Sequence, residues 1–72
     1  NVPSSIANGI AKAGTVQAAL NGNKISETTY YQRLGDIAKS LRSSYPGYRE
    51  YIDQEISKIT RSSSRVAAKR SN

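Results

Sequence analysis

Two short apolar stripes separated by a proline–glycine break constrain the fold of this chain most strongly. Apolar residues recur at positions 30, 34, 37 and 41 and again at positions 48, 52, 56 and 59, spacings that place each set on one face of an α-helix. Pro46 disfavours helical backbone at Tyr45, and Pro46-Gly47 suits a tight turn. Helices joined by so short a connection usually lie antiparallel. The sequence therefore predicts a helical hairpin over residues 24–60, with its second helix beginning near Tyr48.

Three signals mark the beginning of the first hairpin helix. Ser26 is a preferred N-cap residue, because its side-chain oxygen can accept a hydrogen bond from an amide of the first turn. Glu27 places a negative charge at the positive end of the helix dipole. Ile25 and Tyr30 have the spacing of a hydrophobic staple. The helix is therefore expected to begin directly after Ser26.

Residues 1–23 carry a weaker helical pattern. Gly9 and Gly14 each cost about 1 kcal/mol relative to alanine inside a helix, so we expect a broken or mobile helix. The Gly9/Ala13 spacing would permit close approach of a neighbouring helix. Asn21–Asn23 predicts its end, because Gly and Asn accept left-handed backbone. The expected face of this helix consists of Ile6, Ile10, Ala13, Gln17 and Leu20.

The predicted fold class is therefore all-α: two antiparallel helices, a weaker preceding helix over residues 1–23 and a basic, Ser-rich tail over residues 61–72. The apolar content is thin, with seven Ile, three Leu and three Val in 72 residues. Chains of this size without disulfides or metals usually need a partner. We expect that partner, another protein or a further copy of the chain, at an interface formed by Tyr31, Leu34, Ile37, Leu41, Tyr45, Tyr51, Ile52, Ile56 and Ile59. Tyr30 and Tyr48 are expected to close the ends of the core instead.

Composition argues against catalysis. The chain has no Cys and no His, which excludes a thiolate nucleophile, a Ser–His dyad and the usual zinc ligand sets. The carboxylates of the second hairpin helix have cationic helical neighbours, and we expect Asp53 to pair with Arg49 and Glu55 with Lys58. We therefore expect a protein that is not an enzyme and has no cofactor, no metal and no small-molecule substrate.

The net charge of +6 is concentrated near the carboxyl end. Residues 24–55 hold equal numbers of cations and carboxylates, and residues 1–23 hold only Lys12. The remaining cations are Lys58, Arg61, Arg65, Lys69 and Arg70, with no acid among them. Such a run suits non-specific contact with a phosphate backbone, but also contact with an acidic protein or a membrane surface. A solvated terminus or a connector within a longer protein is a further interpretation of the same residues.

Two stretches carry a family resemblance: K-I-S-E-x-x-Y-Y-x-R-L over residues 24–34 and Y-P-G-Y-R-x-Y-I-D over residues 45–53. They resemble segments of the very large internal virion proteins of short-tailed bacteriophages, called ejection or core proteins. The resemblance implies a helical segment of a longer polypeptide, stored in the virion and delivered through the tail to help build a conduit for DNA. It implies other virion proteins as partners and carries over no catalytic residue. A beginning without Met leads to the same expectation of a segment.

Two other functions are compatible with these residues. The first is a free-standing small basic protein that folds as three helices and binds nucleic acid non-specifically. The second is an amphipathic peptide that gains helicity over residues 4–20 on an anionic membrane surface. No stretch of about 18 apolar residues is present, so we expect no membrane-spanning segment.

Overall fold

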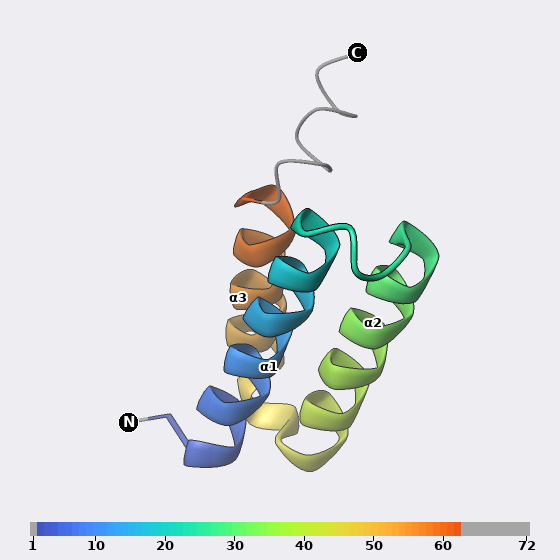
Figure 1. Cartoon of the computed structure of the whole chain (residues 1–72). Helices are drawn as coiled ribbons and strands as arrows, with labels where there is room; N and C mark the ends of the chain where they lie inside the picture. Colours follow the sequence, from blue (N-terminus) through green and yellow to red (C-terminus); the bar gives the residue numbers. More distant parts are fainter. Residues whose placement is uncertain (1, 63–72) are drawn as a thin grey trace.

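Three α-helices follow one another along residues 2–62, the part of the chain that the computed structural model describes. They are α1 (Ser4–Asn21), α2 (Glu27–Ser44) and α3 (Arg49–Ser62), and a short 3₁₀ helix, η1 (Pro46–Tyr48), leads into α3. α2 runs antiparallel to both other helices (Figure 1). The all-α class and the helical hairpin predicted from the sequence are therefore confirmed.

The start of α2 has the predicted N-cap. The Ser26 side-chain oxygen accepts a hydrogen bond from the Thr29 amide at 3.1 Å, and Glu27 lies in the first turn. Ile25 packs against the core cluster that contains Tyr30, as expected for a hydrophobic staple. Local sequence signals alone thus position the amino end of this helix.

The break between α2 and α3 also follows the sequence. The Tyr45 amide still donates to the Leu41 carbonyl at 2.8 Å, after which Pro46 opens the 3₁₀ turn. The Tyr48 amide closes that turn on the Tyr45 carbonyl at 2.9 Å. α3 then begins at Arg49, one residue beyond the expected start.

α1 is continuous from Ser4 to Asn21 and not broken as expected. The reason is tertiary packing: Gly9 and Ala13 are buried, and they bring α1 close to α2. A Cβ atom at Gly9 would collide with the Leu41 side chain, so the glycine allows the contact. Packing of this kind outweighs the low intrinsic helix propensity of the segment.

α1 ends in a Schellman motif. The Lys24 amide donates to the Ala19 carbonyl at 2.8 Å and the Asn23 amide donates to the Leu20 carbonyl at 3.0 Å. Asn23, with a φ of 60°, adopts the left-handed conformation, whereas Gly22 has a φ of −86°. The predicted stop is therefore correct, and Asn23 supplies the turn.

The core consists of two clusters stacked along the bundle. One contains Ala13, Leu20, Tyr30 and Leu34, and the other contains Ile6, Leu41 and Ile52. Ile37 and Ile56 pack against both clusters and join them. Because α1 contributes to each cluster, the apolar stripes of the hairpin pack against α1 as well as against each other.

Candidate nucleic-acid interface

The two predicted cationic residues that fall in the described part of the chain lie on the last turns of α3. Lys58 and Arg61 are both exposed. The Lys58 ammonium contacts the Glu55 carboxylate at 3.0 Å, which confirms the ion pair expected from their spacing. The predictions for Arg65, Lys69 and Arg70 lie outside the described residues.

The fold adds a third cation to this end of the bundle. The loop between α1 and α2 lies at the same end of the bundle as the carboxyl end of α3 (Figure 1). Ile25 in that loop and Ile59 in α3 pack against the same core cluster, so their neighbours Lys24 and Lys58 lie at the same end. We refer to Lys24, Lys58 and Arg61 as the basic end. Sequence reasoning missed Lys24 because only the folded bundle places its loop at the same end as the last turns of α3.

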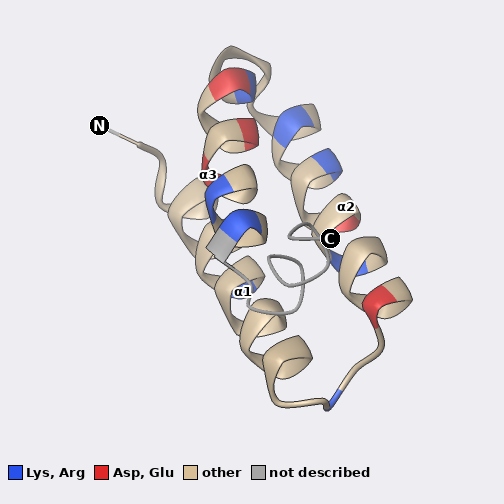
Figure 2. Cartoon of the chain, turned by 90° about the horizontal axis from the view of Figure 1, so that it is seen from above, with Lys and Arg blue, Asp and Glu red and all other residues tan. Residues whose placement is uncertain are grey.

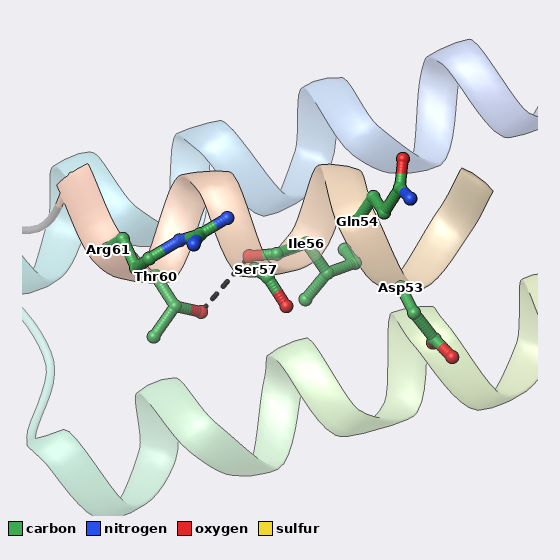
Figure 3. A pocket seen from close by; sticks show the side chains of 6 residues that line it. All are labelled: Asp53, Gln54, Ile56, Ser57, Thr60 and Arg61. Atoms are coloured by element: carbon green, nitrogen blue, oxygen red, sulfur yellow. Dashed lines mark hydrogen bonds between the residues drawn. The ribbon is translucent and has the colours of Figure 1, made fainter. Parts of the chain in front are cut away.

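Exposed polar side chains continue along α3 from the basic end toward the middle of the helix. A shallow hollow of about 420 Å³ is lined by Asp53, Gln54, Ile56, Ser57, Thr60 and Arg61 (Figure 3). Within it the Thr60 hydroxyl donates to the Ile56 carbonyl at 3.1 Å. Gln54, Ser57 and Arg61 are exposed at helical spacing. Amide, hydroxyl and guanidinium donors in a row can hold phosphate oxygens without reading bases.

Charge is distributed unevenly over the three helices. Residues 2–62 contain eight Lys and Arg and five Asp and Glu, a net charge of +3. Lys12 is the only charged residue of α1, whereas α2 and α3 carry charges of both signs (Figure 2). On the described bundle, the cations other than Lys12 therefore lie on α2, on α3 and in the loop between α1 and α2.

One ion pair differs from the sequence expectation. Asp53 pairs with Arg42 of α2 at 2.7 Å, and not with Arg49. The Asp53 side chain points toward α2 (Figure 3), where the Arg42 guanidinium reaches it. The pair links the two hairpin helices and removes Arg42 from the set of cations open to an external anion.

The five tyrosines divide between core and surface. Tyr30 is fully buried, and Tyr45 and Tyr48 are half-buried with their ring centroids 6.5 Å apart. Tyr31 is 48% exposed and Tyr51 is 38% exposed. Tyr31 is thus the exposed ring in the first turns of α2, toward the basic end, where an unpaired base could stack on it.

The apolar residues expected at a protein interface are mostly occupied within the chain. Leu34, Leu41 and Ile52 are buried, because α1 covers the stripe that was expected to face a partner. Ile37, Ile56 and Ile59 are half-buried and pack against the same clusters. Tyr31, Tyr45 and Tyr51 keep exposed surface. An interface through Leu34, Leu41 and Ile52 would require α1 to leave the bundle.

The Tyr30 hydroxyl is the buried side-chain polar atom without a hydrogen bond among the described residues. Burial raises the pKa of the Tyr30 phenol; the nearby Thr60 hydroxyl partly lowers it, and Tyr31 raises it further. The Thr60 hydroxyl donates its proton to the Ile56 carbonyl, and its oxygen lies near the phenol without completing a hydrogen bond. Tyr30 therefore contributes packing at the cost of an unsatisfied hydroxyl.

Within residues 2–62 no group of three or more acidic, His or Cys side chains could hold a metal ion. None of the described helices combines the length and apolar character that crossing a bilayer requires. Comparison of the chain with protein-family models, with curated proteins and with solved structures found no match.

Proposed function

We propose that this chain is a non-enzymatic helical module that contacts the phosphate backbone of nucleic acid through its basic end and packs into a larger helical assembly. One observation carries the proposal. Lys24, Lys58 and Arg61 lie at the end of the bundle from which the chain continues into a segment with further cations and no acid. Contact of this kind neutralises phosphates and releases counterions, so it depends on salt and not on base sequence.

The setting we propose is the virion of a short-tailed bacteriophage. The motifs over residues 24–34 and 45–53 support this setting, since they resemble internal ejection proteins. In such a protein the module would be a structural part stored beside packaged DNA, with other virion proteins or further copies as neighbours. Recovery of peptides from this chain in purified DNA-filled particles, within a product larger than 7.8 kDa, is the expected result. A product of 7.8 kDa would contradict it.

DNA retention tests the phosphate contact through Arg61 and the cations that follow it in the sequence. The test variant replaces Arg61, Arg65, Lys69 and Arg70 with Gln and leaves Lys58 with its Glu55 partner. Since each neutralised phosphate contributes about 0.9 to the slope of log K against log salt, the slope should become shallower by up to about 3–4. The matched control replaces an equal number of exposed cations elsewhere: Lys12, Arg33, Lys39 and Arg49. An equal loss of DNA retention in both variants would show that binding responds to net charge alone, and it would contradict a defined contact.

A free-standing nucleic-acid binder is the second candidate, and the closure of the core favours it. Ile6, Leu20, Tyr30 and Ile52 are fully buried without any other chain. A free-standing protein should unfold cooperatively as a dilute monomer, with a midpoint independent of concentration. A module that depends on neighbours should instead show weak helicity that increases with concentration. Sedimentation and thermal unfolding at two concentrations separate these outcomes.

A further inference from the structure

A groove runs along the seam between α1 and α2. It consists of two hollows of about 390 and 270 Å³ that share Lys12, Asp36 and Ile37. The first hollow is completed by Thr15, Val16 and Arg33 and the second by Gly9, Ser40 and Leu41. None of the lining residues belongs to α3. The groove therefore opens on the face of the α1–α2 pair that α3 leaves uncovered.

The groove is apolar inside, and its edges carry the two cations Lys12 and Arg33 beside one carboxylate, Asp36. Val16 and Ile37 form its floor, and the lining of the first hollow is almost entirely apolar. Lys12 on α1 and Arg33 on α2 stand on opposite walls and are exposed. The ion pairs found within residues 2–62 join other side chains, so both cations can meet an external anion. Their aliphatic stems can cover an apolar guest while the charged heads reach its flanks.

We propose that this groove binds one amphipathic helix of a different protein, with apolar side chains entering between α1 and α2 and carboxylates beside Lys12 and Arg33. The seam of two antiparallel 18-residue helices is a natural seat for a further helix. This proposal rests on the proposed function, because it names the surface through which the module joins its assembly.

A second copy of the chain does not match the groove. Charged groups on α1 are limited to Lys12, so its outer face offers no carboxylate to the two cations. The exposed part of α3 presents Arg49, Lys58 and Arg61 beside Glu50. The exposed large apolar side chains of the described residues, Val2, Tyr31 and Tyr51, lie on three different segments and form no stripe. Charge and pattern therefore favour an acidic partner helix over self-association.

A membrane surface fits less well than a helix. Membrane-binding helices present protruding apolar side chains that enter the acyl region. Here the apolar residues Val16 and Ile37 are half-buried and lie below charged rims. A side chain from a partner helix can reach this floor between the rims, whereas the headgroup surface of a bilayer would rest on the charged rims.

Two synthetic helical peptides of about 18 residues test the proposal, one with Leu on one face flanked by Glu and one with the same Leu pattern flanked by Lys. Fluorescence anisotropy of the labelled peptides measures affinity. The groove variant carries Lys12→Glu and Arg33→Glu, and the matched control carries Lys39→Glu and Arg49→Glu, which change the net charge equally. All four side chains are exposed, so helicity should be preserved in both variants.

The parent chain should bind the Glu peptide, with amide NMR shifts at Thr15, Val16 and Ile37. The groove variant should lose at least about tenfold in affinity and gain binding of the Lys peptide, while the control changes less than about threefold, since tenfold corresponds to 1.4 kcal/mol. Equal loss in both variants, or no saturable binding up to about 1 mM, would overturn the proposal. Concentration-dependent shifts at the groove without peptide, or groove-dependent binding to phosphatidylglycerol vesicles instead of peptide, would also overturn it.

The peptide and DNA experiments fail independently. Absence of peptide binding while DNA retention still depends on Arg61 and the following cations would overturn the groove alone. Peptide binding with DNA retention unaffected by those cations would overturn the phosphate contact and leave the groove.

Discussion

Gly9 of α1 lies so close to Leu41 of α2 that a Cβ atom on Gly9 would stand 2.7 Å from Leu41 Cδ1 and 3.1 Å from its Cγ. Leu41 is buried in the same core cluster as Ile6 and Ile52, and its methyl groups are the atoms nearest to Gly9. The contact sets the separation of the two helices whose seam forms the groove. Gly14, five residues further along the same helix, has open space at the Cβ position.

Alanine at these two glycines should have opposite effects. Gly14→Ala should raise the free energy of unfolding by about 1 kcal/mol, because alanine is the better helix former. Gly9→Ala gains the same propensity but overpacks the seam, which typically costs about 1–3 kcal/mol. The free energies of unfolding of the two variants, measured with urea, should therefore differ by about 1–3 kcal/mol. Equal stabilities would show that Leu41 gives way freely.

A second change tests the physical cause of the Gly9 effect. Leu41→Ala alone should cost about 2–5 kcal/mol, because it leaves a cavity. In the Gly9→Ala background the loss should be smaller, since the added methyl group then occupies part of the vacated space. Strict additivity of the two substitutions would contradict direct contact between these positions.

Tyr30→Phe should stabilise the protein by about 1 kcal/mol at neutral pH, because it removes a buried hydroxyl that lacks a hydrogen bond. It should also change the alkaline response. The pKa of Tyr30 is raised in the folded state above its ordinary 10.0, so the unfolded chain loses the proton first. The contribution of the protonated Tyr30 phenol to the free energy of unfolding is present below pH 10. It is lost as the pH rises through the pKa of Tyr30 in the folded state.

The matched control for this prediction is Tyr31→Phe, because Tyr31 is about half exposed and its hydroxyl is accessible to water. It should leave the neutral stability nearly unchanged. Chemical unfolding of the parent and both variants from pH 8 to 11 provides the comparison, and a Tyr30→Phe variant with the parent's alkaline slope would contradict the assignment.

Ser26→Ala should cost about 1 kcal/mol, because the Thr29 amide then loses its side-chain acceptor. Ser26→Asp should retain most of the stability, since a carboxylate also caps helices. Ser43→Ala is the control: Ser43 is exposed in the last turn of α2 and should change stability by less than about 0.5 kcal/mol. If Ser26→Ala leaves the free energy of unfolding unchanged, the hydrophobic staple of Ile25 and Tyr30 alone stabilises the start of α2.

The Arg42–Asp53 pair should contribute little to the free energy of unfolding, and its contribution should depend on salt. Its side chains are 37% and 48% exposed, and pairs of this kind are worth about 0.2–1 kcal/mol. A double-mutant cycle with Arg42→Gln and Asp53→Asn should give a coupling in that range, which declines between low and high ionic strength. A coupling that is unaffected by salt would contradict the solvent-exposed character of the pair.

Local signals in the sequence were sufficient for the helix ends. Ser26, Pro46 and the Asn21–Asn23 stop act through neighbouring residues, and the Glu55–Lys58 pair lies within one turn. These features depend on the backbone close by, which the sequence specifies directly. They were predicted correctly for that reason.

Features that depend on helix orientation could not be predicted in the same way. The choice of Arg42 over Arg49 as the partner of Asp53 depends on how α3 lies against α2. The burial of Leu34 depends on α1. The glycines of α1 predict a broken helix, and only the structure shows that Leu41 packs against Gly9 and that the helix is continuous. The basic end and the groove both combine residues from different helices, and the order of residues alone does not reveal them.

The described part of the chain has three α-helices, and this odd number has a mechanical consequence. α1 begins at one end of the bundle and α3 finishes at the other, along a longest dimension of 35 Å. Tension applied between Ser4 and Ser62 would therefore act along the helix axes and slide α1 and α3 against α2. Side chains such as Leu41 and Ile52 would resist that sliding together instead of separating one after another. The bundle is arranged to carry load in shear along its axis.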